Sequence, residues 1–400
     1  MKKILLAFAA GFLLSLLIMD SASAIPAFAR RYKLSCSTCH APFPKLKAYG
    51  NDYAGSGFIL QENEKERDYV TAGDDLLWLN KDFPMAVRFD AFAVYESDDA
   101  VKSDLQTPYG LKFLSGGALY KNIGYYFYFF MSETGEVAGI EDAYIHLNNI
   151  FGTHLDVMIG QFQTCDPLMK RELRLTFEDY WIYKIRPGRS YNNLTYDRGI
   201  MLSYDIAKTG TNIVGMIVNG NGKPEAQNSK MDRDQYKNYG IRILQSVTDA
   251  ATIGGFYYYG KEAEYFSGGK AFNEITYYGP DVTIDAGSFG FTGQYLIRQD
   301  SNPVYYNLAN DIQTSGIVAE LVYSPRMDRS RWYLTALYNN ITSDLDDLNL
   351  QDLDVDPLAY ETATLSATFL LSRNFRIVGE LTRDLGRNAN RFVLGLNTAF

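Results

Sequence analysis

A Cys-x-x-Cys-His motif, formed by Cys36, Cys39 and His40, carries the most specific chemistry in this 400-residue chain. Two thiols at this spacing lie on one turn of the chain and add to the two vinyl groups of haem, and the imidazole that follows binds the iron. The motif therefore predicts one covalently attached haem c, with His40 as an axial ligand of its iron.

Two other uses of paired cysteines fit the sequence less well. A thioredoxin-like dithiol belongs to a βαβ unit, and Ala41-Pro42-Phe43-Pro44 after the motif does not continue such a pattern. A structural zinc site needs four ligands, and the 3 Cys and 3 His of the chain provide no second close pair. The remaining cysteine, Cys165, is interpreted as a free thiol without a function.

The second axial ligand of the iron has no candidate close to the motif, because residues 25–83 contain no Met and no His other than His40. The segments that follow must supply this ligand, or the iron is five-coordinate. Successive side chains of a strand point to opposite faces, so those of His146, His154 and Met158 should point away from the apolar face and into the lumen. The candidates are His146, His154, Met85, Met158 and Met169.

The first 24 residues have the layout of a secretory signal peptide, with Lys2 and Lys3 ahead of an apolar run and Ala22-Ser23-Ala24 at its end. The apolar run is shorter than the ~20 residues that a membrane-spanning helix needs. We therefore expect the chain to be exported from the cytoplasm, which suits covalent attachment of haem.

The composition excludes several classes of protein. The 47 acidic residues outnumber the 38 basic ones, and the pI is near 5.0, which argues against a nucleic-acid partner. A mean hydropathy of -0.20 and the lack of a second long apolar run argue against a bundle of membrane helices. The 14% of aromatic residues suit the aromatic girdles of an outer-membrane barrel.

From Pro84 onward the chain alternates apolar and polar residues with a period of two, as in Met85–Tyr95, where Arg88 and Asp90 lie opposite Val87 and Phe89. Short and long connections also alternate, and the chain ends on an aromatic residue, Phe400, as outer-membrane barrels do. Sixteen strands are predicted, near 84–96, 109–120, 122–132, 137–148, 154–162, 195–206, 211–219, 235–246, 250–260, 272–286, 288–299, 312–323, 330–342, 358–371, 374–384 and 390–400.

The predicted fold is mainly β: a sixteen-stranded antiparallel transmembrane β-barrel with a small N-terminal haem-binding domain of the cytochrome c type. Residues 1–24 are assigned to the signal peptide, 25–83 to the monohaem domain and 84–400 to the barrel. A domain of this size is near the lower limit for building its own core, so haem and barrel should stabilise it. We expect it at the periplasmic side or within the lumen.

The connection over 164–194 is unusually long, and such loops are often functional. Its sequence has a helical pattern from Glu172 to Tyr183. We expect the loop to fold into the lumen, to narrow the pore and to cover the haem. A loop is also expected over 261–271, as one of the long connections opposite the short turns.

The chain resembles the fused monohaem cytochrome-porins of the bacterial outer membrane. The residues that carry the resemblance are Phe28-Ala29-Arg30-Arg31-Tyr32 before the haem motif and Ala41-Pro42-Phe43-Pro44-Lys45-Leu46 after it. The resemblance implies a haem domain that caps a porin-like barrel and passes electrons between an extracellular donor or acceptor, ferrous iron among them, and periplasmic c-type cytochromes. The residues carried over are Cys36, Cys39 and His40 alone.

Two functions of different classes stay open, and electron transfer is the first. The alternative is a solute porin whose haem domain is a plug or a sensor, with inward-facing charges lining a wet channel: Arg88, Asp90, Arg242, Arg376 and Glu380. A peroxidase would need a distal His-Arg pair, and the sequence offers none that can be assigned. Enzyme activity as an Fe(II):cytochrome c oxidoreductase, the direction of electron flow and oligomerisation are not decided by the sequence.

Overall fold

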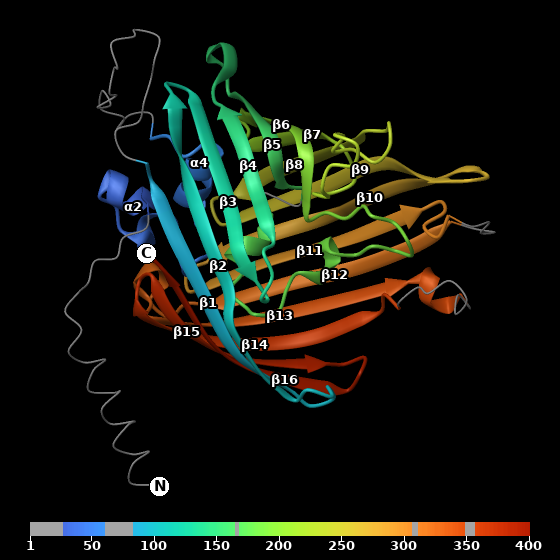
Figure 1. The fold of residues 1–400 in the computed structure, drawn as a ribbon. Coiled ribbons are helices and arrows are strands. Elements are labelled where there is room, and N and C mark those ends of the chain that lie inside the picture. Colours follow the sequence, from blue (N-terminus) through green and yellow to red (C-terminus); the bar gives the residue numbers. More distant parts are fainter. Residues whose placement is uncertain (1–26, 61–82, 165–167, 306–310, 349–356) are drawn as a thin grey trace.

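The computed structural model describes residues 27–60, 83–164, 168–305, 311–348 and 357–400. They form a closed barrel of sixteen antiparallel strands in which each strand pairs with its neighbours in the chain and β1 pairs with β16 (Figure 1). The predicted number, order and direction of the strands are therefore confirmed. The signal peptide over 1–24 and Cys165 lie outside the described residues.

The strands agree closely with the predicted ranges, with their main differences at β2, β9 and β10. Their bounds are β1 Met85–Glu96, β2 Ser103–Tyr120, β3 Ile123–Glu133, β4 Gly139–Leu147, β5 Leu155–Gln163, β6 Tyr196–Ile206, β7 Thr211–Val218, β8 Asn238–Thr248, β9 Ala251–Phe266, β10 Gly269–Ala286, β11 Phe289–Asp300, β12 Ile312–Tyr323, β13 Trp332–Ser343, β14 Tyr360–Ser372, β15 Phe375–Asp384 and β16 Ala389–Ala399.

The loop predicted over 261–271 is wrong, because β9 and β10 continue as a hairpin through most of this stretch. Their register stays regular out to Gly269, which pairs with Phe266. Polar residues such as Lys261 and Glu274 form an ion pair across the two strands. A polar stretch therefore remains extended here, since its backbone has a neighbouring strand to pair with.

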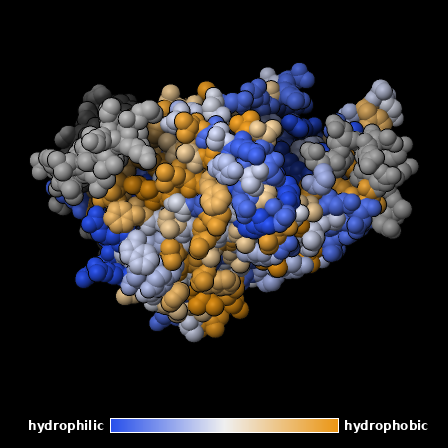
Figure 2. All heavy atoms as spheres, turned by 90° about the horizontal axis from the view of Figure 1, so that it is seen from below, coloured by the Kyte–Doolittle hydropathy of each residue, from blue (hydrophilic) through white to orange (hydrophobic). Residues whose placement is uncertain are grey.

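Alternation along the strands separates an apolar outer face from a polar lumen, as the sequence predicts. In β12, buried and more exposed residues alternate along the whole strand. Glu320 is buried on the lumen side, whereas Leu321 beside it is exposed on the outside. Figure 2 shows apolar residues gathered over the barrel wall, with hydrophilic residues toward the ends. No helix in the described ranges is both long and apolar enough to cross a membrane.

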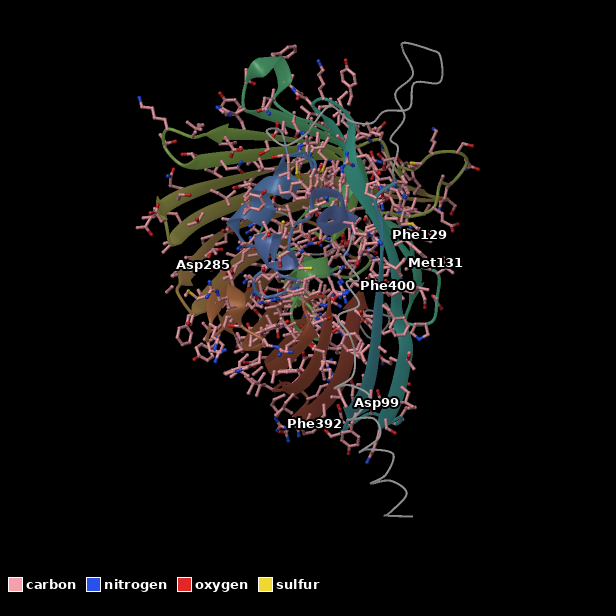
Figure 3. The ribbon with its side chains drawn as sticks, turned by 90° about the vertical axis from the view of Figure 1, so that its left-hand side faces the viewer. Asp99, Phe129, Met131, Asp285, Phe392 and Phe400 are labelled. Carbon is pink, nitrogen blue, oxygen red and sulfur yellow. The ribbon has the colours of Figure 1, made fainter. Side chains whose placement is uncertain are left out.

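The short turns lie at one end of the barrel, where β1 begins and β16 ends. The last residue, Phe400, pairs there with Val87, with N···O distances of 2.8 and 2.9 Å. Tight hairpins at this end use Gly210 and Gly287, whose φ angles of 67° and 60° favour a residue without a Cβ. This short-turn end faces the viewer in Figure 3.

The N-terminal segment lies at this same end and contains the helices α2 Ala27–Tyr32, α3 Cys36–Cys39 and α4 Ala48–Gly55. Lys45 forms an ion pair of 2.8 Å with Glu320 of β12. The Tyr333 hydroxyl of β13 donates a hydrogen bond of 2.7 Å to the Phe43 carbonyl. The side-chain amide of Asn148, just after β4, donates a hydrogen bond of 2.6 Å to the Ser56 carbonyl. The segment is thus fixed to separate parts of the barrel wall.

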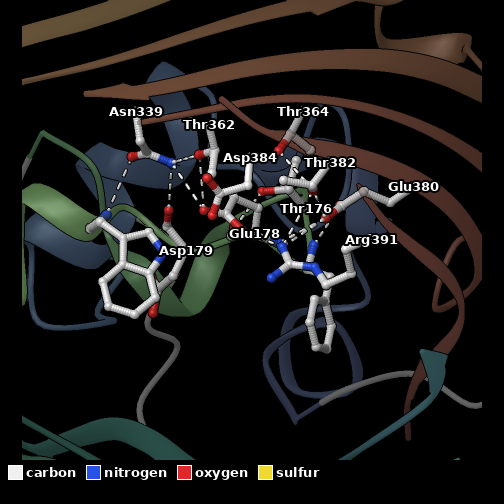
Figure 4. A network of polar contacts seen from close by, with 12 residues as sticks. Thr176, Glu178, Asp179, Asn339, Thr362, Thr364, Glu380, Thr382, Asp384 and Arg391 are labelled. Carbon is white, nitrogen blue, oxygen red and sulfur yellow. Dashed lines mark hydrogen bonds and ion pairs between the residues drawn. The ribbon is translucent and has the colours of Figure 1, made fainter. Parts of the chain in front are cut away.

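The connection between β5 and β6 folds into the lumen, as expected, but the helix predicted from Glu172 to Tyr183 is wrong. This described stretch contains only short 3-10 turns over Arg171–Leu173 and Trp181–Tyr183. Its backbone amides bond to the wall instead: Phe177 and Glu178 donate to the Glu380 carboxylate at 2.7 and 2.9 Å (Figure 4). Because the barrel supplies these acceptors, helical hydrogen bonds are not required.

Apolar packing and buried charge hold this lumen loop, defined here as residues 168–194. Tyr180, Ile182 and Tyr183 belong to one buried cluster with residues of several strands. Arg298 of β11 pairs with Asp300 at 2.6 Å and donates to the loop carbonyls of Ile185 and Asn192 at 3.2 and 2.9 Å. A buried ion pair therefore serves as an anchor for the loop.

We predict that Arg298→Met destabilises the folded barrel by about 3–5 kcal/mol, because it leaves Asp300 buried without its cation. Urea unfolding in detergent, followed by tryptophan fluorescence, measures the effect. The matched control is Lys261→Met, which breaks a more exposed pair and should cost about 1 kcal/mol or less. Equal shifts for the two variants would show that Arg298 is not an anchor.

Candidate cofactor site

The Cys-x-x-Cys part of the motif is a single helical turn, α3. The turn begins after Ser35, whose hydroxyl accepts a hydrogen bond of 3.4 Å from the Ser37 amide. The His40 amide donates to the Cys36 carbonyl at 2.9 Å, which closes the turn. Cys36 and Cys39 are free thiols and are half-buried. One turn therefore carries both thiols and the imidazole that follows them.

The His40 ring is held in one orientation. Its Nδ1 lies 2.6 Å from the Pro44 carbonyl oxygen, and because a carbonyl only accepts, Nδ1 carries the proton. This leaves the lone pair of Nε2 for a metal, an arrangement that orients many metal-binding histidines. Burial lowers the pKa of His40 to about 4, so the ring is neutral at pH 7.

The helix α4 lies directly against the motif, and glycine makes this approach possible. A Cβ at Gly50 would clash with the Cys39 carbonyl oxygen. The Lys47 amide donates to this same oxygen at 2.9 Å. The helix α4 thus packs against the backbone of the motif at the Cys39 carbonyl.

Cys36, Cys39 and His40 line a cavity of about 1,370 Å³ between the N-terminal segment, the barrel wall and the lumen loop. Sites for small ligands usually measure about 300–1,000 Å³, so a porphyrin has room here. The wall is apolar at Tyr126 and Met201 and carries both cations, such as Arg88 and Arg242, and carboxylates, such as Glu172. An amphipathic macrocycle fits the apolar part of this lining if its acidic side groups lie toward the cations.

Arg242 is a candidate anchoring group that the sequence marks only as a lumen charge. It is buried on β8 and pairs with Asp281 at 2.7 Å. Its second terminal nitrogen, Nη1, is buried and has no hydrogen-bond partner among the described residues. A buried N–H group of this kind favours an acceptor, and a carboxylate of a bound group would satisfy it. The donor set of the cavity therefore fits haem.

Of the five candidates for the second axial ligand, the structure brings His146, Met158 and Met169 to the wall of this cavity. Met85 does not reach it, because its side chain lies on the outer face of β1 with 43% of its surface exposed. His154, expected to face the lumen, is exposed in the turn before β5. Alternation predicts the direction of a side chain only within a strand, and His154 precedes Leu155, the first paired residue of β5.

His146 and Met158 lie directly opposite each other on β4 and β5. His146 is 4% exposed, and its Nδ1 has no hydrogen-bond partner in the described part of the chain. The N-terminal segment passes very close to it, since a Cβ at Gly57 would lie 3.1 Å from the His146 Cβ. A buried imidazole nitrogen without a partner makes His146 the strongest of the three candidates.

A carboxylate connects the motif to the lumen loop. The two oxygens of Glu320 accept hydrogen bonds from Lys45 and from the Tyr180 hydroxyl, each of 2.8 Å. Lys45 follows the Pro44 carbonyl that holds His40, and Tyr180 lines the cavity from the loop side. Sequence patterns could not pair these residues, because they lie on three segments far apart in the chain.

Comparison with known proteins bears on the fold. No family model matches the chain, and no curated protein does. Solved structures that are similar include an anion-selective porin from Comamonas acidovorans, with a TM-score of 0.58, 11% identity, and coverage of 80% of this chain and 99% of that one. OmpF of Salmonella typhi, in complex with daunomycin, has a TM-score of 0.55 and 11% identity, and the match covers 79% of this chain and 97% of OmpF. The trimer form of OmpT from Vibrio cholerae has a TM-score of 0.54 and 11% identity, and the match covers 79% of this chain and 98% of OmpT.

These likenesses define the class of fold. The described strands form a porin-type barrel that spans nearly the whole of each similar chain. At such low identity the likeness extends to the fold alone.

We predict that His146→Ala converts the visible spectrum of the haem-loaded protein from low spin to high spin, because the iron loses its second imidazole. Met158→Leu and Met169→Leu are the matched controls, and their spectra should stay low spin. A low-spin spectrum in His146→Ala, or a high-spin spectrum in wild type, would remove His146 from the site. Low spin lost only in a Met variant would assign the ligand to that methionine.

Proposed function

We propose that this protein transfers electrons across the bacterial outer membrane through one covalent haem c, as a member of the monohaem cytochrome-porins. Cys36 and Cys39 would hold the haem as thioethers, and His40 would bind its iron. The observation that carries the proposal is that both free thiols and the oriented His40 ring line one large cavity inside a porin-type barrel. The apolar outer face and the porin fold support placement in the outer membrane.

Haem supplies one-electron chemistry when it is bound, and the residues of the chain determine its setting. Pro44 holds His40 in one tautomer, so Nε2 is available to the iron. Arg242 offers a buried N–H to an acidic side group. Tyr180 and other residues of the lumen loop line the cavity from the loop side. The fixed surroundings keep the cost of reorganisation on charge transfer small.

Charges of the lumen wall contact the inserted lumen loop, which argues against a wide open pore. Arg88 donates to the Glu172 carbonyl at 2.9 Å, and Glu380 accepts from the backbone of the lumen loop. Arg391 forms ion pairs with Glu178 of the loop and, at 3.9 Å, with Glu380. These charges hold an inserted segment in place, whereas the charges of a conducting pore line open water.

A solute porin is the second candidate, because the chain shares the barrel of solute-conducting porins. In this alternative the N-terminal segment acts as a plug or a sensor. The direction of electron flow stays open in the first candidate, and so does the extracellular partner, for which ferrous iron is one choice. A periplasmic c-type cytochrome is the proposed partner at the short-turn end.

Proteoliposomes separate the two candidates. We predict that haem-loaded protein lets external ferrous iron reduce an acidic ferric cytochrome c enclosed in the vesicles, because the haem provides a path for electrons through the wall. The same vesicles should swell in sugar solutions far more slowly than vesicles with an open porin. The matched control is Cys36→Ala/Cys39→Ala, in which reduction of the enclosed cytochrome should stop.

Two results would contradict the proposal. Swelling as fast as that of an open porin, without reduction of the enclosed cytochrome, would assign solute transport. Reduction that continues at the same rate in Cys36→Ala/Cys39→Ala would show that haem attached at these residues does not carry the electrons. External ferric chelates, with reduced cytochrome inside, test flow in the opposite direction.

A further inference from the structure

The short-turn end of the barrel has cationic and acidic regions that lie next to each other. The turn before β13 and the turn after β14 carry the cationic rim, defined here as Arg326, Arg329, Arg331 and Arg373. Exposed carboxylates lie at the ends of β6 and β10 and just after β8, at Asp205, Asp285 and Asp249, and the turn after β10 bonds to the first cationic turn through Ser288 and Ser324. Asp285 is visible on this edge of the barrel in Figure 3.

The motif lies next to the cationic rim. A small hollow there is lined by Cys36, His40, Phe43, Met327 and Arg373, among others. The turn with Arg326 and Arg329 therefore lies beside the segment that carries Cys36. The three aspartates line the larger cavity but not this hollow.

The charge of the cationic rim is not cancelled locally. Asp328 is the acidic residue of its first turn, and it forms an ion pair of 2.6 Å with Lys47 of the N-terminal segment. Arg326 and Arg329 have exposed side chains on either side of it. Met327, between them, has 56% of its surface exposed. An exposed apolar side chain in the same turn as two exposed arginines resembles the surfaces on which proteins meet transiently.

We propose that the cationic rim is the docking surface for a soluble electron carrier that presents acidic side chains around its own cofactor. This inference rests on the proposed function and names the kind of partner. Electron transfer falls off steeply with distance, so a partner must dock where the cofactor-bearing cysteines approach the surface. Opposite charges would steer the carrier to the cationic rim, and the aspartates of the neighbouring turns would repel it from the rest of this end.

The reaction in the docked pair is a single electron transfer. The group bonded to Cys36 and Cys39 gains or loses one electron, and the cofactor of the carrier loses or gains the same electron. No bond forms or breaks, and no proton has to move. A transient, salt-sensitive contact suits this use, since the carrier must leave after each transfer.

Binding measured without haem tests the surface apart from the proposed function. The full chain with Cys36→Ala/Cys39→Ala, in detergent, is titrated with an acidic type-1 copper protein and with a basic soluble cytochrome c. We expect the copper protein to bind and the cytochrome not to bind, with an affinity that falls as salt is added. Arg326→Glu/Arg329→Glu should weaken binding of the copper protein roughly tenfold or more and allow binding of the cytochrome.

The matched control is Lys121→Glu/Lys208→Glu, which reverses the same number of exposed positive charges in the turns after β2 and β6 and should leave binding of the copper protein within about twofold. Equal effects of the two double variants, or no effect of either, would overturn the proposal. Binding of anionic lipid vesicles that depends on the arginines, without binding of the copper protein, would overturn it too and make the rim a membrane contact.

The outcomes distinguish this inference from the proposed function. A wild-type protein without covalent haem whose arginines still bind the acidic carrier would defeat the proposed function and leave the docking surface standing. A haem-loaded protein that passes electrons but binds the carrier equally in both double variants would defeat the docking surface alone. Heat-modified migration of each variant on a gel verifies that its barrel is folded.

Discussion

A strand inside a membrane has no water to bond to, so the sheet of a membrane barrel must close on itself. Closure with sixteen strands leaves a lumen too wide for the side chains of the wall to fill, and barrels of this size usually enclose a water channel. Here two segments occupy the interior: the N-terminal helices at the short-turn end and the lumen loop between β5 and β6. The cavity beside the Cys-x-x-Cys-His motif is the space that they leave.

Filling a polar lumen with protein requires buried charges to be paired, and the pairs give the inserted segments fixed positions. Arg298 holds the carbonyls of the lumen loop, while Glu380 holds its amides. Glu320 serves both segments, because its two oxygens accept from Lys45 and from Tyr180. The wall therefore positions the motif and the loop relative to each other without direct hydrogen bonds between them being required.

The barrel could be predicted closely from the sequence because its signal is local and repeated. Each strand alternates with a period of two, and turn residues such as Gly210 mark its ends. The lumen loop could not be predicted in detail, since the apparent helix around Phe177 is replaced by hydrogen bonds to Glu380, some 200 residues further along the chain. Local helix propensity does not determine the structure here, because the barrel wall supplies the hydrogen-bond acceptors.

The candidate site divides in the same way. Cys36, Cys39 and His40 are recognisable from their spacing alone. Met85 and His154 are sequence candidates that the cavity does not include, because one faces outward and the other lies in a turn. Other groups of the candidate site are Arg242 and the contact of Gly57 with His146. They depend on which strands the N-terminal segment contacts, and a single sequence does not show that contact.

The central claim is that the motif carries covalent haem within this barrel. The most direct measurement is the intact mass of the full chain, expressed with a cytochrome c maturation system, exported, purified in detergent and denatured. The account predicts one haem per chain that survives denaturation and is absent from Cys36→Ala/Cys39→Ala. A folded barrel whose mass is that of the polypeptide alone, under conditions in which a control cytochrome c is matured, would contradict it.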